Sequence, residues 1–155
     1  MAATSTNKQP LLVDRVLHYV VNLDDHVNDG IDPFGANTAI LLVNAIGTDG
    51  AIIEDVYSLA RSASAADINL YISTAGDYLR ANESQFIGTF KSATTVGAST
   101  HWEEMPRTLT PVPQVGDYSY NKALYLPKGR ALWAARNSTA VLTDGPLVGC
   151  QGGWF

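Results

Sequence analysis

Short segments in which apolar and polar residues alternate recur along this chain, and a period of two is typical of β-strands. Residues 67–73 are the clearest case, because Ile68, Leu70 and Ile72 share one face of the expected strand and the residues between them share the other. This pattern predicts a strand that is buried on one face only.

Three further segments carry strand-forming residues between loops rich in Asp, Asn, Gly and Pro. The expected strands are residues 11–23, 37–45 and 86–90, the last with Phe86 and Phe90 on one face. The intervening loops are residues 24–35 and 47–50.

The late part of the chain predicts a hairpin, because two short β-type runs flank a turn that contains Pro and Gly. The runs are residues 123–126 and 131–134, and the turn is Pro-Lys-Gly-Arg at 127–130. Residues 141–142 and 147–148 are expected to add a last edge strand before the terminal Gly-Gly-Trp-Phe.

Residues 52–63 fit two patterns. Ile52, Val56, Leu59 and Ala60 have the spacing of one face of a helix. The β-branched residues and the short flanking turns fit a bulged strand instead, and we favour the strand.

Many short strands separated by turns are typical of a β-sandwich or a jelly roll. We therefore expect an all-β fold, a jelly-roll-like antiparallel β-sandwich, in one domain that comprises residues 11–155. Residues 1–10 are small and polar and end at Pro10. They are expected to form a flexible N-terminal arm, either a frayed end or an arm that docks on an adjacent subunit.

The composition of the chain argues against two classes of binding partner, nucleic acids and anionic membrane surfaces. Of the 155 residues, 46% are hydrophobic and only 16% are charged, with a net charge of −5. The ten basic residues are scattered, which argues against nucleic acid, and the acidic balance disfavours an anionic membrane surface. A surface with few charges suits a protein that partners cover in an assembly.

The cysteine count and the N-terminus bear on the compartment. Cys150 is the only cysteine, so the fold needs no internal disulfide. The first residues lack the apolar core of a signal peptide, and no apolar run approaches the ~18 residues of a membrane helix. We therefore expect synthesis in a cytoplasm.

The sequence carries no motif that is typical of an enzyme. It lacks the Gly-x-Ser-x-Gly elbow and the glycine-rich phosphate and dinucleotide loops. His18, His26 and His101 have neither His-x-His nor His-x-x-x-His spacing, so a metal site would have to be assembled across the fold. Glu103 and Glu104 are adjacent and would point to opposite faces of a strand. We therefore expect no catalytic residue, no cofactor and no metal.

The sequence leaves two other ligands as alternatives, a calcium ion and a glycan. Residues 24–32 contain four aspartates and would suit calcium by composition, although their spacing does not fit the helix-loop-helix calcium pattern. Exposed aromatic residues would suit a glycan, but Trp and Tyr are more often core or interface anchors. The aromatic residues concerned are Trp102, Tyr118, Tyr120, Trp133 and Trp154. Cys150 is expected to be a small buried hydrophobe rather than a nucleophile.

The order of several short motifs resembles a pattern in small β-sandwich proteins of tailed-phage virions. An apolar strand ends in a turn at residues 39–50, Ile-Glu-Asp-Val follows at 53–56, and an alternating strand follows at 67–72. Leu-Tyr-Leu-Pro-Lys-Gly-Arg-Ala-Leu-Trp-Ala at 124–134 is similar to a Leu-Pro-x-Gly hairpin of that pattern, and Gly-Gly-Trp-Phe at 152–155 to its end. The segment between Met105 and Tyr120 departs from it.

The resemblance implies a capsid cement or decoration protein. Such a protein lies on the capsid surface of the virion, binds the major capsid protein, stabilises the head and forms a homotrimer. Position in loops and the arm suggests the interface residues Asn7, Lys8, Gln9, Pro10, Asp32, Pro33, Phe34, Trp102, Pro111, Pro113, Tyr118 and Tyr120. The alternatives are a tail or baseplate component, as an adaptor or a reader of host glycans, and a small hydrolase or lyase on a β-sandwich.

Overall fold

The structure of the chain is a computed structural model that describes residues 15–24, 26–28, 38–105, 123–137 and 144–155. These residues form ten strands, and none of them lies in a helix. The strands are β1 (Arg15–Asn22), β2 (Val27–Asn28), β3 (Ile40–Asn44), β4 (Gly50–Leu59), β5 (Asp67–Ser73), β6 (Ser84–Lys91), β7 (Ser99–His101), β8 (Leu124–Pro127), β9 (Ala131–Asn137) and β10 (Leu147–Trp154).

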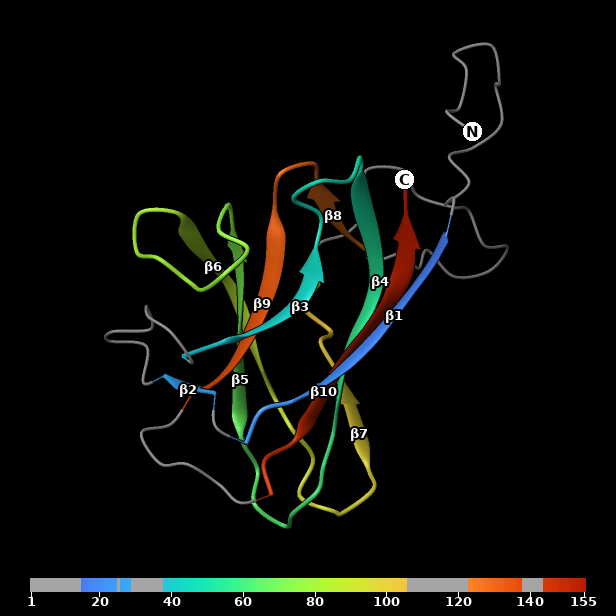
Figure 1. The fold of residues 1–155 in the computed structure, drawn as a ribbon. Helices are drawn as coiled ribbons and strands as arrows, with labels where there is room; N and C mark the ends of the chain where they lie inside the picture. The colour runs from blue at the N-terminus through green and yellow to red at the C-terminus, as the bar shows by residue number, and fades with distance from the viewer. Residues whose placement is uncertain (1–14, 25, 29–37, 106–122, 138–143) are drawn as a thin grey trace.

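The strands form two sheets that pack against each other as layers (Figure 1). In sheet A the order is β1-β10-β4, and β7 and β8 both pair with β4, one towards each end of it. In sheet B the order is β9-β5-β6, and β2 and β3 both pair with the other side of β9. The pairs are antiparallel except for the two-residue pair of β2 with β9.

The strand pairs are nested along the chain, as in a jelly roll. β1 pairs with β10, β3 with β9, β4 with β8, and β5 with β6. Each pair encloses the next one in sequence, so the chain is a long antiparallel ribbon rolled over itself. The expected jelly-roll-like sandwich is therefore confirmed, whereas the arm of residues 1–10 lies outside the described residues.

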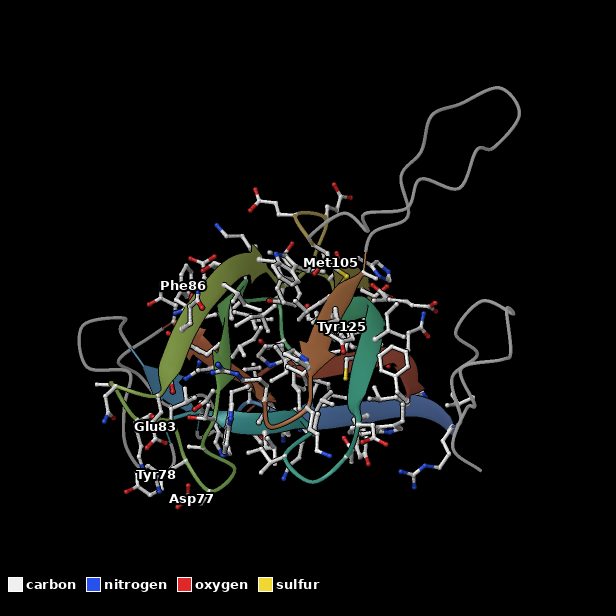
Figure 2. All side chains as sticks on the ribbon, turned by 90° about the horizontal axis from the view of Figure 1, so that it is seen from above. Asp77, Tyr78, Glu83, Phe86, Met105 and Tyr125 are labelled. Atoms are coloured by element: carbon white, nitrogen blue, oxygen red, sulfur yellow. The ribbon has the colours of Figure 1, made fainter. Side chains whose placement is uncertain are left out.

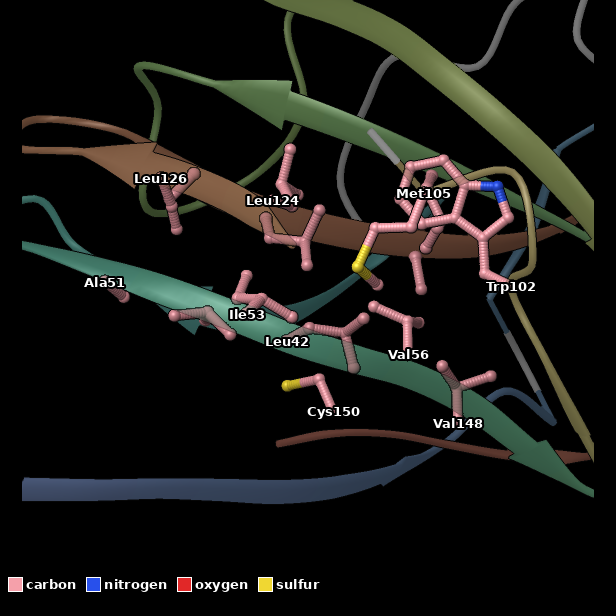
Figure 3. Packing of buried hydrophobic residues seen from close by; sticks show 14 of the residues in the cluster. Leu42, Ala51, Ile53, Val56, Trp102, Met105, Leu124, Leu126, Val148 and Cys150 are labelled. Atoms are coloured by element: carbon pink, nitrogen blue, oxygen red, sulfur yellow. The ribbon is translucent and has the colours of Figure 1, made fainter. Parts of the chain in front are cut away.

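Aliphatic side chains from both sheets fill the space between the layers. Figure 3 shows part of this core, in which the Cys150 side chain lies among aliphatic neighbours. The largest fully buried apolar side chains of this core are Leu17, Leu23, Val43, Ile53, Val56, Ile68, Leu70, Leu126, Leu132 and Val148. Each contributes about 1.5–3 kcal/mol relative to an exposed position, so hydrophobic packing between the sheets is the main stabilising contribution.

The prediction that residues 67–73 form a strand is confirmed, but the prediction of one exposed face is wrong. Tyr71 on the outer face of β5 is only 3% exposed. It belongs to a second apolar cluster with Trp133 of β9 and Leu79. The segment that carries Leu79 covers the outer face of sheet B, and the Trp133 indole N–H donates to the carbonyl oxygen of Ala75 at 3.2 Å.

Residues 52–63 contain a bulged strand, as favoured over the helix, since β4 extends from Gly50 to Leu59. Opposite β10, Ile53 pairs with Gly152 and Asp55 pairs with Gln151, so Glu54 is the extra residue of the bulge. The bulge reverses the alternation: Ile53 is buried before it and Val56 after it. The residues with helix-like spacing therefore do not share a face, since Ile52 lies on the outer face of the sheet and Val56 lies in the core.

A bulge also makes the predicted common face of Phe86 and Phe90 wrong. Both residues lie on β6, but the register against β5 shifts between Leu70 and Tyr71, which leaves Ile87 unpaired. Phe90 therefore lies in the core, whereas Phe86 packs edge-on against Tyr71 on the outer face, with ring centroids 5.7 Å apart.

The predicted hairpin at residues 123–134 is wrong, because its two strands belong to different sheets. β8 pairs with β4 in sheet A, and β9 pairs with β3 and β5 in sheet B. The turn itself forms: the Arg130 N–H donates to the Pro127 carbonyl oxygen at 3.2 Å, and Gly129 has φ of 79°. A turn of this type fixes a reversal in direction but not the partner of either strand.

The remaining predictions are partly confirmed. The first strand forms over Arg15–Asn22, and the expected strand at residues 37–45 forms β3. The expected loop at residues 24–35 contains the short strand β2. Of the expected last edge strand, residues 141–142 lie outside the described residues, and residues 147–148 belong to β10. β10 is central rather than an edge, since it lies between β1 and β4, and it includes the Gly-Gly-Trp sequence.

Candidate interaction surface

The outer face of sheet A carries exposed side chains, and these fall into rows across the strands. Residues directly opposite in antiparallel strands project from the same face, so the pairing register defines these rows. We call the following residues the sheet A face: Val16, His18, Val20, Ile52, Asp55, Tyr57, His101, Tyr125, Gly149, Gln151 and Gly153.

The first row of the sheet A face is apolar. Val16, Gly153, Ile52 and Tyr125 lie opposite one another in turn across β1, β10, β4 and β8. Val16 is 82% exposed and Tyr125 is 58% exposed. The Tyr125 ring also packs on Phe155, with centroids 5.7 Å apart. In Figure 2 the labelled Tyr125 lies on β8, well away from Phe86 and Tyr78 over sheet B.

The other rows combine an aromatic ring with two histidines. Tyr57 lies across Gly149, where an added Cβ would come 2.6 Å from the Tyr57 hydroxyl oxygen. The missing side chain lets Tyr57 reach over β10 to β1, and its hydroxyl lies 2.8 Å from Nε2 of His18. On the other side of Tyr57, Nδ1 of His101 lies 2.9 Å from the Asp55 carboxylate.

A strip of three side chains, His18, Tyr57 and His101, thus crosses the sheet A face. Its electrostatics favour hydrogen bonding over nucleophilic chemistry. Burial raises the pKa of the Tyr57 hydroxyl above its usual value, and the nearby Cys150 and Asp55 raise it further. Tyr57 therefore stays a neutral phenol at neutral pH. The rings of His18 and His101 lie on opposite sides of it, with centroids 6.3 Å and 6.2 Å away. The two hydrogen-bonded pairs thus offer donors and acceptors along a surface rather than around one point.

A groove of about 510 Å³ lies between the edge strands β6 and β7 and meets the sheet A face at His101. Its polar lining consists of Thr89, Lys91, Ser99, Thr100, His101, Glu103 and Glu104. Phe90 and Trp102 complete the lining, but both are almost fully buried. Glu103 and Glu104 follow β7 in a turn and are both exposed, so the strand geometry expected for them does not apply.

Trp102 is the one predicted interface residue that the structure describes. It is 3% exposed, packs over Gly88 and lies beside Met105 in the core (Figure 3). Its burial leaves it almost no surface with which to contact a partner. The other eleven predicted interface residues, Asn7, Lys8, Gln9, Pro10, Asp32, Pro33, Phe34, Pro111, Pro113, Tyr118 and Tyr120, lie outside the described residues.

The described part of the aspartate-rich loop does not offer a vacant ligand. The Asp24 carboxylate accepts hydrogen bonds from Asn22 at 2.6 Å, from Arg61 at 3.2 Å and from the backbone N–H of Gly145. Asp25, Asp29 and Asp32 lie outside the described residues. Within the described ranges, no three His, Cys, Asp or Glu side chains come close enough together to hold a metal ion.

Cys150 is buried in the core, as expected. Burial raises the pKa of its thiol to about 12, which keeps it protonated at neutral pH. A thiol without thiolate character is a poor nucleophile, so Cys150 acts as a small apolar side chain.

The sequence reasoning treated the three histidines singly and missed the strip of His18, Tyr57 and His101. They come from β1, β4 and β7, which are far apart in sequence. In β4, Tyr57 stands between the buried residues Val56 and Ser58, and this alternation indicates an outward side chain. The bulge at Glu54 breaks the alternation earlier in the strand, so the sequence alone does not show which face is outward.

No protein-family model matches the chain, and no curated protein or solved structure matches it significantly. No helix among the described residues has the length and hydropathy needed to cross a membrane.

Proposed function

We propose that this chain is a capsid cement protein of a tailed phage, which binds the major capsid protein and stabilises the head without catalysing a reaction. The observation that carries the proposal is the sheet A face. It presents an exposed apolar row beside a strip of aromatic and hydrogen-bonding side chains.

This combination suits a protein partner. Interfaces are enriched in aromatic residues and depleted of charged ones at their centre, and Tyr125, Tyr57, Val16 and Ile52 supply such a centre. A regular sheet presents these groups in fixed positions, so little conformational entropy is lost on binding.

The resemblance in motif order supplies the identity of the partner in this proposal. Small jelly-roll-like sandwiches with this order of motifs decorate phage capsids, where they are commonly trimers over junctions between capsid subunits. Symmetry repeats each contact, so modest single interfaces add up through multivalency. The proposal therefore includes a homotrimer on the capsid surface and no nucleic acid or membrane partner.

The test is binding to capsids stripped of their decoration protein. We expect wild-type protein to saturate the capsids and Tyr125→Asp to bind at least tenfold more weakly, because a charge would be buried in the apolar row. Val96→Asp is the matched control, since Val96 is 65% exposed in the turn before β7. Both variants should keep the thermal midpoint of the wild type. Equal binding of all three proteins would refute the sheet A face as the capsid contact.

A further inference from the structure

β1 is an edge strand of sheet A, and no described strand pairs with its outer side. Among the described strands it pairs with β10 alone, over eight consecutive residues. Its other side therefore presents a row of backbone N–H and C=O groups, and Figure 1 shows β1 along the rim of the layer beside β10. Such a row is a template for another strand.

The other described edges carry features that prevent strand addition. β2 and β7 have only two and three residues, and β8 ends with Pro127. β3 and β6 each have an irregular register, and β6 also ends with Lys91. Short length, proline, bulges and lysine are the usual protections of an edge strand.

β1 has none of these protections. Its register is regular from Arg15 to Asn22, it contains no proline, and its only charged residue stands at its first position. Val16, Tyr19 and Val20 are 82%, 49% and 48% exposed. Exposed valine and tyrosine along a regular edge strand favour cross-strand pairing over solvation.

We propose that β1 is the docking edge for a second copy of this chain, whose own β1 pairs with it antiparallel about a two-fold axis. Two identical antiparallel edges are self-complementary, because the axis places each donor opposite an acceptor. With His18 opposite His18 of the second copy, Val16 meets Val20 and Arg15 meets Val21. No two guanidinium groups then face each other, so the single charge of β1 does not oppose the pairing.

This pairing joins the two A sheets into one continuous sheet across the axis. It is a two-fold contact, so it predicts an even number of chains: a dimer, or a hexamer if the chain also trimerises through other surfaces. The pairing is independent of the capsid and goes beyond the proposed function.

The first test is the mass in solution by light scattering at micromolar concentration. We expect an even number of chains for the wild type, and half that number for the double variant Val16→Lys and Val20→Lys. Lysines at these exposed positions place four positive charges along the paired edges, and they leave the core untouched. The control Val96→Lys should keep the wild-type mass. A wild-type mass of one or three chains overturns the pairing, as does a double variant with unchanged mass.

The second test reads the register by cross-linking. In a Cys150→Ala background, we expect air oxidation to link two chains at His18→Cys, because His18 lies on the axis in this register and faces its own copy. Val96→Cys is the control and should stay unlinked. The absence of a link at His18→Cys overturns this pairing. Neither test involves a capsid, so a negative result in these tests does not affect the capsid proposal. In the same way, a failure to bind capsids does not affect the β1 pairing.

Discussion

Two glycines of β10 allow close contacts that no other residue permits. Gly149 lies under the Tyr57 ring, and Gly152 lies against the backbone of β4 at the Glu54 bulge. An added Cβ at Gly152 would overlap the carbonyl oxygen of Ile52 and come 2.9 Å from Cα of Ile53. The backbone of a central strand cannot move away as the end of a side chain can.

Gly152→Ala is therefore expected to destabilise the fold by about 1–3 kcal/mol, the usual cost of overpacking. Gly47→Ala is the matched control, because nothing lies within 4 Å of the added methyl group. It should change the free energy of unfolding by less than about 0.5 kcal/mol. Denaturant unfolding of the three proteins measures both values, and equal midpoints would contradict the close approach at the bulge.

Cys150 makes stability depend on alkaline pH. Its pKa is raised from 9.0 to about 12 in the folded chain, so between these values the unfolded chain loses a proton that the folded chain keeps. Stability from this group is thus complete below pH 9 and decreases as the pH rises towards 12, by up to about 1.4 kcal/mol per pH unit.

We expect the wild type to lose more stability between pH 8 and about pH 10.5 than Cys150→Ala does. The comparison of the two slopes removes the contribution of tyrosines and lysines, which both proteins share. Urea unfolding at each pH gives the slopes. Parallel slopes would show that the thiolate forms as readily in the folded chain as in the unfolded one.

At the scale of elements, the sequence predicts where most strands lie but not which face of each is buried. β5 was predicted with its bounds because its alternation is uninterrupted. In β4 and β6 a single bulged residue, Glu54 or Ile87, reverses the alternation. A bulge depends on the partner strand, so a pattern read along one strand does not contain it.

The cover over sheet B is an element that the alternation does not predict. Residues between β5 and β6 place Leu79 on Tyr71 and Trp133, and Leu79 is 1% exposed. Salt bridges of Arg80 with Asp77 at 2.6 Å and Glu83 at 3.0 Å hold the same segment. The segment therefore adds a small second core outside the sandwich.

Leu79→Ala is expected to cost about 2–4 kcal/mol, because it leaves a cavity over two aromatic rings. The adjacent Tyr78→Ala is the control: Tyr78 is 38% exposed and lies 4.4 Å from the Arg80 guanidinium, so its loss should cost under about 1 kcal/mol. Thermal unfolding compares the two. A Leu79→Ala variant as stable as the wild type would show that the segment contributes nothing to the fold.

At the scale of the molecule, the number of strands and their turns were enough to predict a jelly-roll-like sandwich. The pairing of the strands was not predicted, since it depends on contacts between residues distant in sequence: β1 pairs with β10 and β4 with β8. The sheet A face follows from that pairing. Val16, Ile52 and Tyr125 form one row only once the four strands β1, β10, β4 and β8 lie side by side, and His18 reaches Tyr57 only once β1, β10 and β4 do.

The proposed role on the capsid predicts how many copies of this chain each particle contains. A cement protein is repeated over the junctions of the head, whereas a tail or baseplate component is present in only a handful of copies. Both roles would use the exposed row of Val16, Ile52 and Tyr125. Copy number separates them.

The most direct measurement is therefore the copy number of this chain in the intact phage particle, by quantitative mass spectrometry against the major capsid protein. We expect a fixed, near-stoichiometric ratio to the capsid subunits, with hundreds of copies per particle, that disappears when heads are stripped. A handful of copies that remain with isolated tails, or no copies in the particle, would contradict it.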